Sequence, residues 1–377
     1  MNIDTIRTLF PHLATGQIYF NHASLGPWHE FIFNRLNEYA KERSGNNVMN
    51  FESYVKYSQS AKNKLALLLG TVSERIAWVD NVSNAMSLVA QGLNFKHGDR
   101  IIINDIEFPA NVYPFLNLKK HGIEIDIVKS RNGKVDLEDI AKGVTPNTKL
   151  VSISLVQFLS GYRADIKAIG DFCKDKNILF CVDAIQAAGV VNIDIKNMNI
   201  DFLCGGTHKW LMNCQCVSYF FMSEELQSMI EQKYVGWASV KNAWNFLDYN
   251  LELKDGIDRF QNGTQNEFGV CLLDAALDMF KDFTIGEFET RIIDNSEYFI
   301  NALSTVGYEP ILRDVNRKNL SGIVSVKIND EERIFNFLKR MEVHCAIREG
   351  ILRFSPHFYN TKDEIDSVIE ALKQIEN

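Results

Sequence analysis

The chain has 377 residues, of which 46% are hydrophobic and 23% charged, so it can bury a large core and is long enough for two domains. Its net charge is −8 and no basic block stands out, which argues against a nucleic acid or an anionic membrane as a partner. The first twenty residues lack the pattern of a signal peptide, and no apolar run reaches membrane-spanning length. We therefore expect a cytoplasmic protein that acts on small molecules.

Short apolar runs rich in β-branched residues recur along the first two thirds of the chain, and turn residues and helical patterns follow them. These runs cover residues 76–79, 100–104, 149–155, 178–182 and 201–204. The alternation predicts an α/β fold with a mainly parallel central sheet and flanking helices. After the first run, Met86, Val89, Ala90 and Leu93 have the spacing of an amphipathic helix.

Beyond about residue 270 the pattern changes to longer amphipathic helices and a few strands, which predicts a smaller C-terminal α+β domain. We expect residues 19–270 to form the large domain, and residues 1–18 and 271–377 to form the small one. The final helix begins with a capping box between Thr361 and Glu364, and we assign it a packing role.

The seven cysteines are an odd number, and several lie in apolar segments, so we expect free thiols rather than disulfides. Cys214 and Cys216 form a C-x-C pair, but no second pair of cysteines or histidines has metal-ligand spacing. We therefore expect no metal site and predict that both cysteines pack within a strand.

Polar residues follow three of the apolar runs directly. Asp183 ends one run, Lys209 follows another through a glycine-rich turn, and Ser83 follows the first at a helix start. Ligands of an open parallel sheet bind beyond the carboxyl ends of its strands, so these groups should converge on one cleft. A lysine, a carboxylate and a helix N-terminus are the groups that a pyridoxal phosphate site requires.

The segment DAIQAAGVVNIDIKNMNIDFLCGGTHKWL, residues 183–211, resembles the cofactor-binding core of class V aminotransferase-like enzymes. This fold type I group includes cysteine desulfurases, isopenicillin N epimerase-like proteins and kynureninases. Four further segments occur in the order of that family: YFNHASLGP at 19, EFPANVYPF at 107, RFQNGTQN at 259 and LRFSPHFYNT at 352. The resemblance implies pyridoxal 5'-phosphate as the cofactor and an amino acid as the substrate.

The resemblance also implies a role for each matching residue. Lys209 would hold the cofactor as a Schiff base and act as general base, and Asp183 would pair with the pyridine nitrogen. Phe108 would lie over the ring, Gln186 would contact the phenolic oxygen, and Gln157 is a weaker candidate for a cofactor contact. Phosphate contacts are expected from Ser83, Asn84, Ala85, Thr207 and His208, and from Thr264 of a partner subunit, which implies a homodimer.

Arg353 resembles the arginine that binds the substrate carboxylate, and Arg348 lies close enough in sequence to share that role. The match departs from cysteine desulfurases at this point, because their catalytic cysteine lies on a loop for which AIREGILR has no room. We expect Cys345 to be a packed thiol. A second departure is NCQC at 213–216, where relatives commonly have a glycine-containing turn.

These residues favour a class V aminotransferase, with an amino-acid epimerase or a C–S or C–C lyase as the alternative. An epimerase needs a second acid, for which His22 and His29 are candidates. A nicotinamide-dependent oxidoreductase is disfavoured because the chain has no G-x-G-x-x-G motif. A non-catalytic protein that keeps the fold is also possible in principle. The identity of the amino acid is left open, as is whether Trp237, Trp244 and Phe246 line a pocket or cover a dimer interface.

Overall fold

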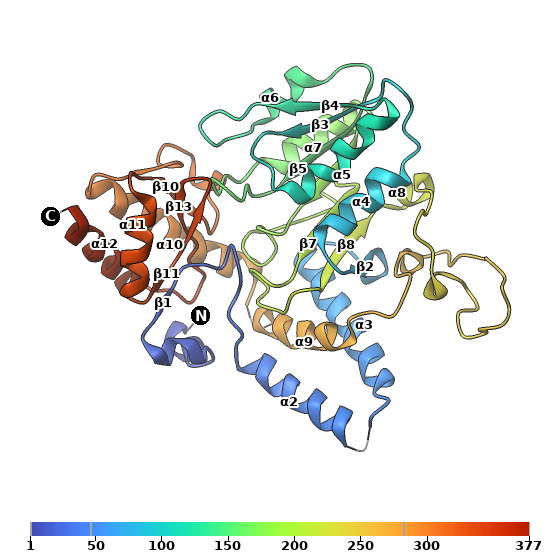
Figure 1. Cartoon of the computed structure of the whole chain (residues 1–377), viewed down its shortest axis with the longest axis horizontal. Coiled ribbons are helices and arrows are strands. Elements are labelled where there is room, and N and C mark those ends of the chain that lie inside the picture. The colour runs from blue at the N-terminus through green and yellow to red at the C-terminus, as the bar shows by residue number, and fades with distance from the viewer. Residues whose placement is uncertain (1, 46, 282, 377) are drawn as a thin grey trace.

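The computed structural model of the chain describes residues 2–45, 47–281 and 283–376. Its larger part is built on a seven-stranded sheet with the order β2-β8-β7-β6-β5-β3-β4, and its smaller part on a four-stranded sheet with the order β12-β13-β10-β9 (Figure 1). The smaller sheet and its helices come from the last third of the chain, as the change of sequence pattern beyond about residue 270 predicts.

The large sheet contains β2 (Ile76–Val79), β3 (Arg100–Asn104), β4 (Glu124–Val128), β5 (Thr148–Ser154), β6 (Leu179–Asp183), β7 (Phe202–Gly206) and β8 (Ser218–Met222). The neighbouring strands β4, β3, β5, β6 and β7 pair in parallel with one another. Strand β8 is antiparallel to both β7 and β2. Parallel strands need a crossover connection, but the chain returns from β7 to β8 by a turn, so β8 runs the opposite way. The sheet is mainly parallel, as the sequence predicts.

Successive residues of each strand point to opposite faces of this sheet. Ile101 and Ile103 pack on one face with α4 (Val82–Gly92), while Ile102 packs on the other face with α3 (Phe51–Leu69) and α7 (Ile166–Asp175). Strands with apolar residues on both faces must be covered on both, which explains the continuous apolar runs in the sequence. Shorter helices complete this part: α5 (Tyr113–Leu116), α6 (Leu137–Gly143) and α8 (Glu224–Met229).

The smaller part combines β9 (Glu309–Pro310), β10 (Val324–Lys327), β12 (Ala346–Arg348) and β13 (Ile351–Phe354) with α10 (Ile285–Thr305), α11 (Glu331–Arg340) and α12 (Lys362–Glu376). The predicted capping box of α12 is present, because the Thr361 N–H donates to Glu364 Oε2 at 3.0 Å and the Glu364 N–H donates to Thr361 Oγ1 at 3.3 Å. No helix within the described ranges is both long and apolar enough to cross a bilayer.

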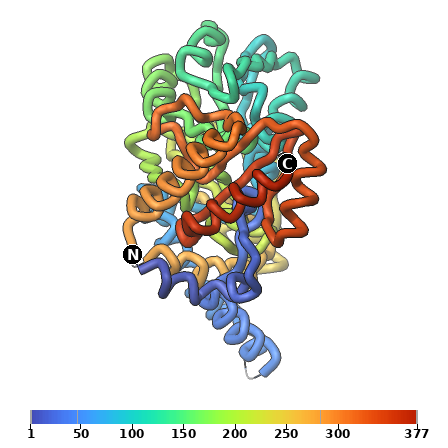
Figure 2. Tube along the Cα trace, turned by 90° about the vertical axis from the view of Figure 1, so that its left-hand side faces the viewer, coloured from blue at the N-terminus to red at the C-terminus, as the bar shows by residue number. Residues whose placement is uncertain are grey.

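The N-terminal segment lies beside the smaller part (Figures 1 and 2). It includes α1 (Ile3–Arg7) and β1 (Ile18–Tyr19), and β1 pairs in parallel with β11 (Val343–His344). Residues 20–29 then run to α2 (Glu30–Ser44), which packs with α3 against α9 (Glu267–Leu277). Because α9 continues through residue 270, the predicted domain boundary lies inside one helix, and the domain limits stay a prediction.

Candidate active site

Asp183 and Lys209 lie at the same edge of the large sheet, as expected for residues that follow neighbouring parallel strands. Asp183 is the last residue of β6 and is the partner of Cys204 on β7, five residues before Lys209. The charge of each group opposes the pKa shift that burial causes at the other group. Both residues thus lie at the sheet edge where the sequence analysis places them, and their roles toward a cofactor stay a prediction.

Asp183 is a buried carboxylate that is only half satisfied. Asp183 is 1% exposed, and its Oδ1 accepts a hydrogen bond of 2.9 Å from the Ile185 N–H. Oδ2 has no hydrogen-bond partner among the described residues. Burial raises the pKa of Asp183 to about 7; the Ile185 hydrogen bond opposes this shift, the charge of Glu107 adds to it, and Lys209 opposes it. A buried oxygen without a donor is costly in a folded protein and is typical of a site that binds a ligand.

Lys209 is a half-buried amine with a depressed pKa. Burial lowers the pKa of Lys209 to about 8; Asp183 opposes this shift, and the charges of Arg353 and Arg348 add to it. Its Nζ lies 5.7 Å from the centroid of the Phe108 ring. Phe108 is 44% exposed and meets Phe158 edge to face at 5.3 Å, so its outer face is open. A usable fraction of neutral amine is thus present near neutral pH, beside an aromatic ring.

The turn around Lys209 is held by close backbone packing. The Gly26 N–H donates to the His208 carbonyl at 2.8 Å, and a Cβ at Gly26 would lie 2.1 Å from the Lys209 carbonyl oxygen. The Thr207 hydroxyl is buried and donates to the Val217 carbonyl at 2.6 Å, just before β8 begins. This residue braces the turn, and its predicted contact with a phosphate stays a prediction.

The NCQC segment forms the end of the same turn rather than part of a strand. Met212 and Cys216 adopt left-handed backbone conformations, with φ of 58° and 60°. Such angles are uncommon for residues other than glycine and cost about 1 kcal/mol or more each. Cys214 is half-buried and Cys216 is exposed, so the prediction that both pack in a strand is wrong.

The N-terminus of α4 presents fewer donors than predicted. Asn81 caps the helix and its Oδ1 accepts from the Asn84 N–H at 2.9 Å, while its carbonyl accepts from the Ala85 N–H at 3.2 Å. Ala85 is fully buried, so it has no group to offer to a phosphate. Ser83 and Asn84 are exposed, and the Ser83 N–H and the two side chains are the groups at this end that suit an anion.

His208 is half-buried beside these groups. Burial, helped by the charge of Lys209, lowers the pKa of His208 to about 4. Its ring is therefore neutral at neutral pH, and it can take part in a site as a hydrogen-bonding group rather than as a cation.

Of the two glutamines near the site, Gln157 rather than Gln186 has an amide oxygen without a partner among the described residues. Gln186 donates to the Ala23 carbonyl at 3.0 Å and accepts from Trp210 Nε1 at 2.7 Å, so both ends of its amide are used inside the protein. Gln157 donates to Glu107 at 2.9 Å and is buried, but its Oε1 has no partner within the described ranges. Gln157 is thus the better placed acceptor for a ligand hydroxyl.

Glu107 is a central residue of the site that the sequence analysis missed. This carboxylate is 7% exposed and accepts hydrogen bonds from Asn104, Asn111, Gln157 and the backbone and hydroxyl groups of Ser154. Ser154 is the β5 partner of Asp183, which explains why the charge of Glu107 reaches that carboxylate. The spacing of Asn104, Glu107 and Asn111 at the end of a strand was the available signal.

Two arginines complete the site and share one hydroxyl group. Arg353 is 2% exposed and donates to the Phe158 carbonyl at 2.8 Å and to Ser24 Oγ at 3.0 Å, while its Nε has no partner in the described part of the chain. Burial, with a smaller effect of Arg348, lowers the pKa of Arg353 to about 9. Arg348 is exposed and also donates to Ser24 Oγ at 3.0 Å. The predicted substrate arginines therefore converge, and Ser24, which the sequence analysis did not select, joins them.

The two candidate histidines and Thr264 remain; the ring of His22 stacks on Trp210, the residue after Lys209. His22 is buried and bonds to the Tyr359 hydroxyl at 2.6 Å, and burial lowers its pKa well below the ordinary range. Burial likewise lowers the pKa of His29 to about 4, so both rings are neutral at neutral pH and neither is the protonated imidazolium that could serve as an acid. Thr264 is exposed on the chain before α9, and its predicted contact with a second subunit is not tested by one chain.

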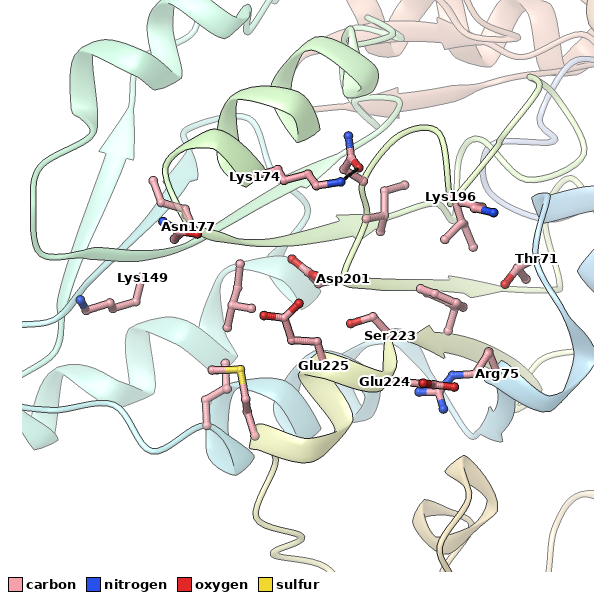
Figure 3. A pocket seen from close by; sticks show the side chains of 18 of the residues that line it. Thr71, Arg75, Lys149, Lys174, Asn177, Lys196, Asp201, Ser223, Glu224 and Glu225 are labelled. Carbon is pink, nitrogen blue, oxygen red and sulfur yellow. Dashed lines mark hydrogen bonds between the residues drawn. The ribbon is translucent and has the colours of Figure 1, made fainter.

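A large cavity of the described residues lies elsewhere, at the opposite edge of the large sheet. It has a volume of about 1340 Å³, and residues at the starts of β5, β6 and β7 line it (Figure 3). Lys149, Lys174, Asp201 and Glu225 surround it with charges of both signs. Lys209 and Asp183 do not line it. Cavity size therefore does not identify the chemical site, which the unpaired buried groups do.

Comparison with known proteins agrees with this geometry. The family model described as aminotransferase class V matches residues 18–368. The chain belongs to the class V aminotransferase family. A probable cysteine desulfurase of Methanothermobacter thermautotrophicus is 27% identical over all of this chain and 98% of its own length. The uncharacterized aminotransferase YcbU of Bacillus subtilis is 26% identical over 86% of this chain and 85% of its own.

Solved structures show the same fold at lower identity. The cystine C–S lyase C-DES, in complex with its product cysteine persulfide, matches with a TM-score of 0.87 and 21% identity over 97% of this chain and 99% of its own. Another structure of that lyase carries glycine covalently linked to its pyridoxal phosphate. This class V enzyme thus has the fold type I architecture, and pyridoxal phosphate is the cofactor of its family.

The residues present fit that cofactor. The orphan Oδ2 of Asp183 has the charge and the free acceptor capacity that a protonated pyridine nitrogen needs. Lys209 supplies an amine of depressed pKa, and the end of α4 supplies donors for a phosphate. Phe108 and Gln157 supply an open aromatic face and a free carbonyl oxygen. Each unsatisfied group of the site therefore has a counterpart on pyridoxal phosphate.

Proposed function

We propose that this class V enzyme is an aminotransferase that acts on the α-amino carbon of an amino acid, with Lys209 as the residue that anchors pyridoxal phosphate. The observation that carries the proposal is the half-buried amine of Lys209 at the same sheet edge as the buried carboxylate of Asp183, whose Oδ2 lacks a donor among the described residues. Arg353 supports it, because a buried guanidinium without a carboxylate partner among the described residues suits the α-carboxylate of an amino acid.

The chain's own residues divide the work of such a reaction. Pyridoxal phosphate, when bound, supplies a ring that withdraws electrons from the substrate Cα. Arg353 orients the substrate through its carboxylate, and Asp183 holds the positive charge at the ring nitrogen through Oδ2. The neutral amine of Lys209 takes the proton from the substrate Cα and returns it later.

A C–S lyase is the second candidate, and the geometry near Arg353 bears on it. The turn between β12 and β13 contains Glu349 and Gly350 and no cysteine, and Cys345 is buried with its pKa raised to about 12 by burial. A thiol in this state is a poor nucleophile, so we do not propose a desulfurase that carries sulfur on Cys345. A lyase that cleaves a C–S bond of its substrate need not carry sulfur on Cys345, so the lyase remains the second candidate.

A labelled amino-group transfer assay decides between these activities. The protein loaded with pyridoxal phosphate is given ¹⁵N-labelled amino acids with a panel of α-keto acids, and products are read by mass spectrometry. Labelled nitrogen in a new amino acid supports the aminotransferase. Release of ammonia and a keto acid from cystine, without an added keto acid, supports the lyase. Lys209→Ala should abolish either reaction, and Lys196→Ala, an exposed lysine at the opposite cavity, is the matched control.

We also propose that the enzyme works as a homodimer in the cytoplasm. Thr264 is exposed, and an aromatic cluster of Trp237, Trp244 and Phe246 is 46%, 67% and 64% exposed on the preceding loop. A contiguous exposed aromatic patch is typical of an interface between subunits. All seven cysteines are free, which suits a reducing compartment. Sedimentation of the protein, with Trp244→Ser and Phe246→Ser as the variant, tests the dimer, which should dissociate on substitution.

A further inference from the structure

Arg348 and Arg353 are held on one face of a tight hairpin. Arg348 of β12 is the cross-strand partner of Ile351 of β13. Cross-strand partners share a face of the sheet, and residues two apart on a strand also share a face, so Arg348 and Arg353 point to the same side. The turn between the strands is only residues 349–350, with φ of 49° and 72°. This short connection fixes the register and with it the placement of both guanidinium groups.

The two cations have no anion of the protein between them. Within the described residues, neither arginine forms an ion pair, and the acceptors of both are carbonyl oxygens and the Ser24 hydroxyl. Arg353 is 2% exposed and its Nε is unpartnered. Like charges that share one acceptor repel each other, and a buried charge without a counter-ion is costly. Such a pair is stabilised by an anionic ligand.

The position and depth of the arginines indicate what this ligand is. Both charges contribute to the depressed pKa of Lys209, so the pair acts on the catalytic amine. Arg353 is buried, whereas Arg348 is exposed at the rim, so the two groups lie at different depths. One carboxylate is satisfied by one planar guanidinium in a bidentate contact. The second guanidinium is then free for a second acidic group farther out.

We propose that the site selects amino acids with an acidic side chain, with Arg353 binding the α-carboxylate and Arg348 the side-chain acid. This inference rests on the proposed function, which assigns the α-carboxylate to Arg353. A substrate with two acidic groups offers one anion to each of Arg353 and Arg348, neither of which forms an ion pair within the described residues. Charge complementarity of this kind favours the acidic substrate over neutral amino acids of similar size.

Ser24 is the positioning residue of this pair. A hydroxyl oxygen has two acceptor sites, and the two guanidinium groups use Ser24 Oγ as a common acceptor at 3.0 Å each. Its own proton is left to donate to an acid group of the ligand. The segment that carries Ser24 is tied to the Lys209 turn by the hydrogen bond from Gly26 to His208. Ser24 therefore sets the spacing between the two cations relative to the amine.

The test compares two ligands that have four carbons each and differ by one acid group. Binding of succinate and butyrate to the protein loaded with pyridoxal phosphate is measured by titration calorimetry. A charge-assisted contact is worth about a 10- to 100-fold change in affinity, so succinate should bind at least about 10-fold more tightly than butyrate. Arg348→Ala should bring this ratio close to one and leave butyrate affinity nearly unchanged, because Arg353 remains.

Controls separate positioning from folding and from the proposed function. Arg313→Ala removes an exposed arginine that pairs with Glu309, and it should keep the ratio. Ser24→Ala should lower the ratio, and Ser24→Thr, which restores the hydroxyl, should recover it. Equal affinities for the two ligands in the unaltered protein, or an unchanged ratio in Arg348→Ala, overturn the inference.

Cofactor uptake is measured on the same samples by absorbance. Failure of uptake overturns the proposed function and with it the assignment of the α-carboxylate to Arg353, whereas the binding of two acid groups by Arg353 and Arg348 is decided separately. The succinate-to-butyrate ratio of the cofactor-free protein then decides the inference by the same criteria.

Discussion

Replacing Asp183 by asparagine should stabilise the cofactor-free protein at pH 8 even though it damages the site. Asp183 is 1% exposed, and its Oδ2 has no partner within the described residues. Burial raises its pKa from 3.8 to about 7. The folded protein therefore keeps the proton more firmly than the unfolded chain does between these two pH values.

The sign and size of the effect follow from linkage. Because the pKa of Asp183 is raised in the folded state, the free energy of unfolding falls as the pH rises from about 4 to about 7. Over this range the carboxyl group of the unfolded chain ionises first. The shift corresponds to about 4 kcal/mol at pH 7 and above. Asparagine has no charge and keeps an acceptor for the Ile185 N–H. We expect a gain of about 2–4 kcal/mol at pH 8 and almost none at pH 4.

Urea unfolding of both cofactor-free proteins at several pH values between 4 and 8 measures this gain. Asp274→Asn is the matched control, because Asp274 is 3% exposed but pairs with Arg35 at 2.9 Å and Lys64 at 2.6 Å. Its ion pairs and hydrogen bonds lower the pKa of Asp274 despite burial, so that variant should lose stability at pH 8. A gain in Asp183→Asn that does not depend on pH, or a loss at pH 8, would refute the reasoning.

Three further predictions follow from the same groups. The rate at which the cofactor-free protein takes up pyridoxal phosphate should rise with pH through about 8, because the neutral amine of Lys209 is the reactive form, and a rate that is flat between pH 6 and 9 contradicts this. Glu107→Gln should cost about 2–4 kcal/mol in urea unfolding, because an amide oxygen cannot accept all the hydrogen bonds that the carboxylate receives; a change below about 0.5 kcal/mol counts against that network. Cys345→Ala should keep the turnover of the enzyme within about twofold, since the buried thiol has a pKa of about 12, and a loss of activity in a stably folded variant would assign this cysteine a chemical role.

Much of the fold is predictable from the sequence, because buried parallel strands require continuous apolar runs and their ends carry the polar residues of a site. The runs before Asp183 and Lys209 are β6 and β7, and their polar ends meet at one edge. The strand β4 was missed, since its residues Glu124–Val128 alternate in polarity and lie at the edge of the sheet, half exposed. A strand was expected to include Cys214 and Cys216, but β8 begins only at Ser218, after both cysteines.

The roles of individual polar residues are less predictable, because they depend on contacts between distant parts of the chain. Gln186 is occupied by Ala23 and Trp210, and Thr207 by Val217, and neither contact has a signal in the local sequence. Ser24 reaches Arg353 across 329 positions. A resemblance in motif order predicts which residues form the site, whereas only the structure shows which of these groups lack a partner among the described residues.

The measurement that tests the central claim most directly is the visible absorption spectrum of the purified protein mixed with pyridoxal phosphate, beside Lys209→Ala and the control Lys196→Ala. A yellow band that survives gel filtration in the unaltered protein and the control, is changed in Lys209→Ala and responds to an acidic amino acid is the predicted result. A spectrum that shows no bound cofactor, or one that is identical in Lys209→Ala, would contradict the account.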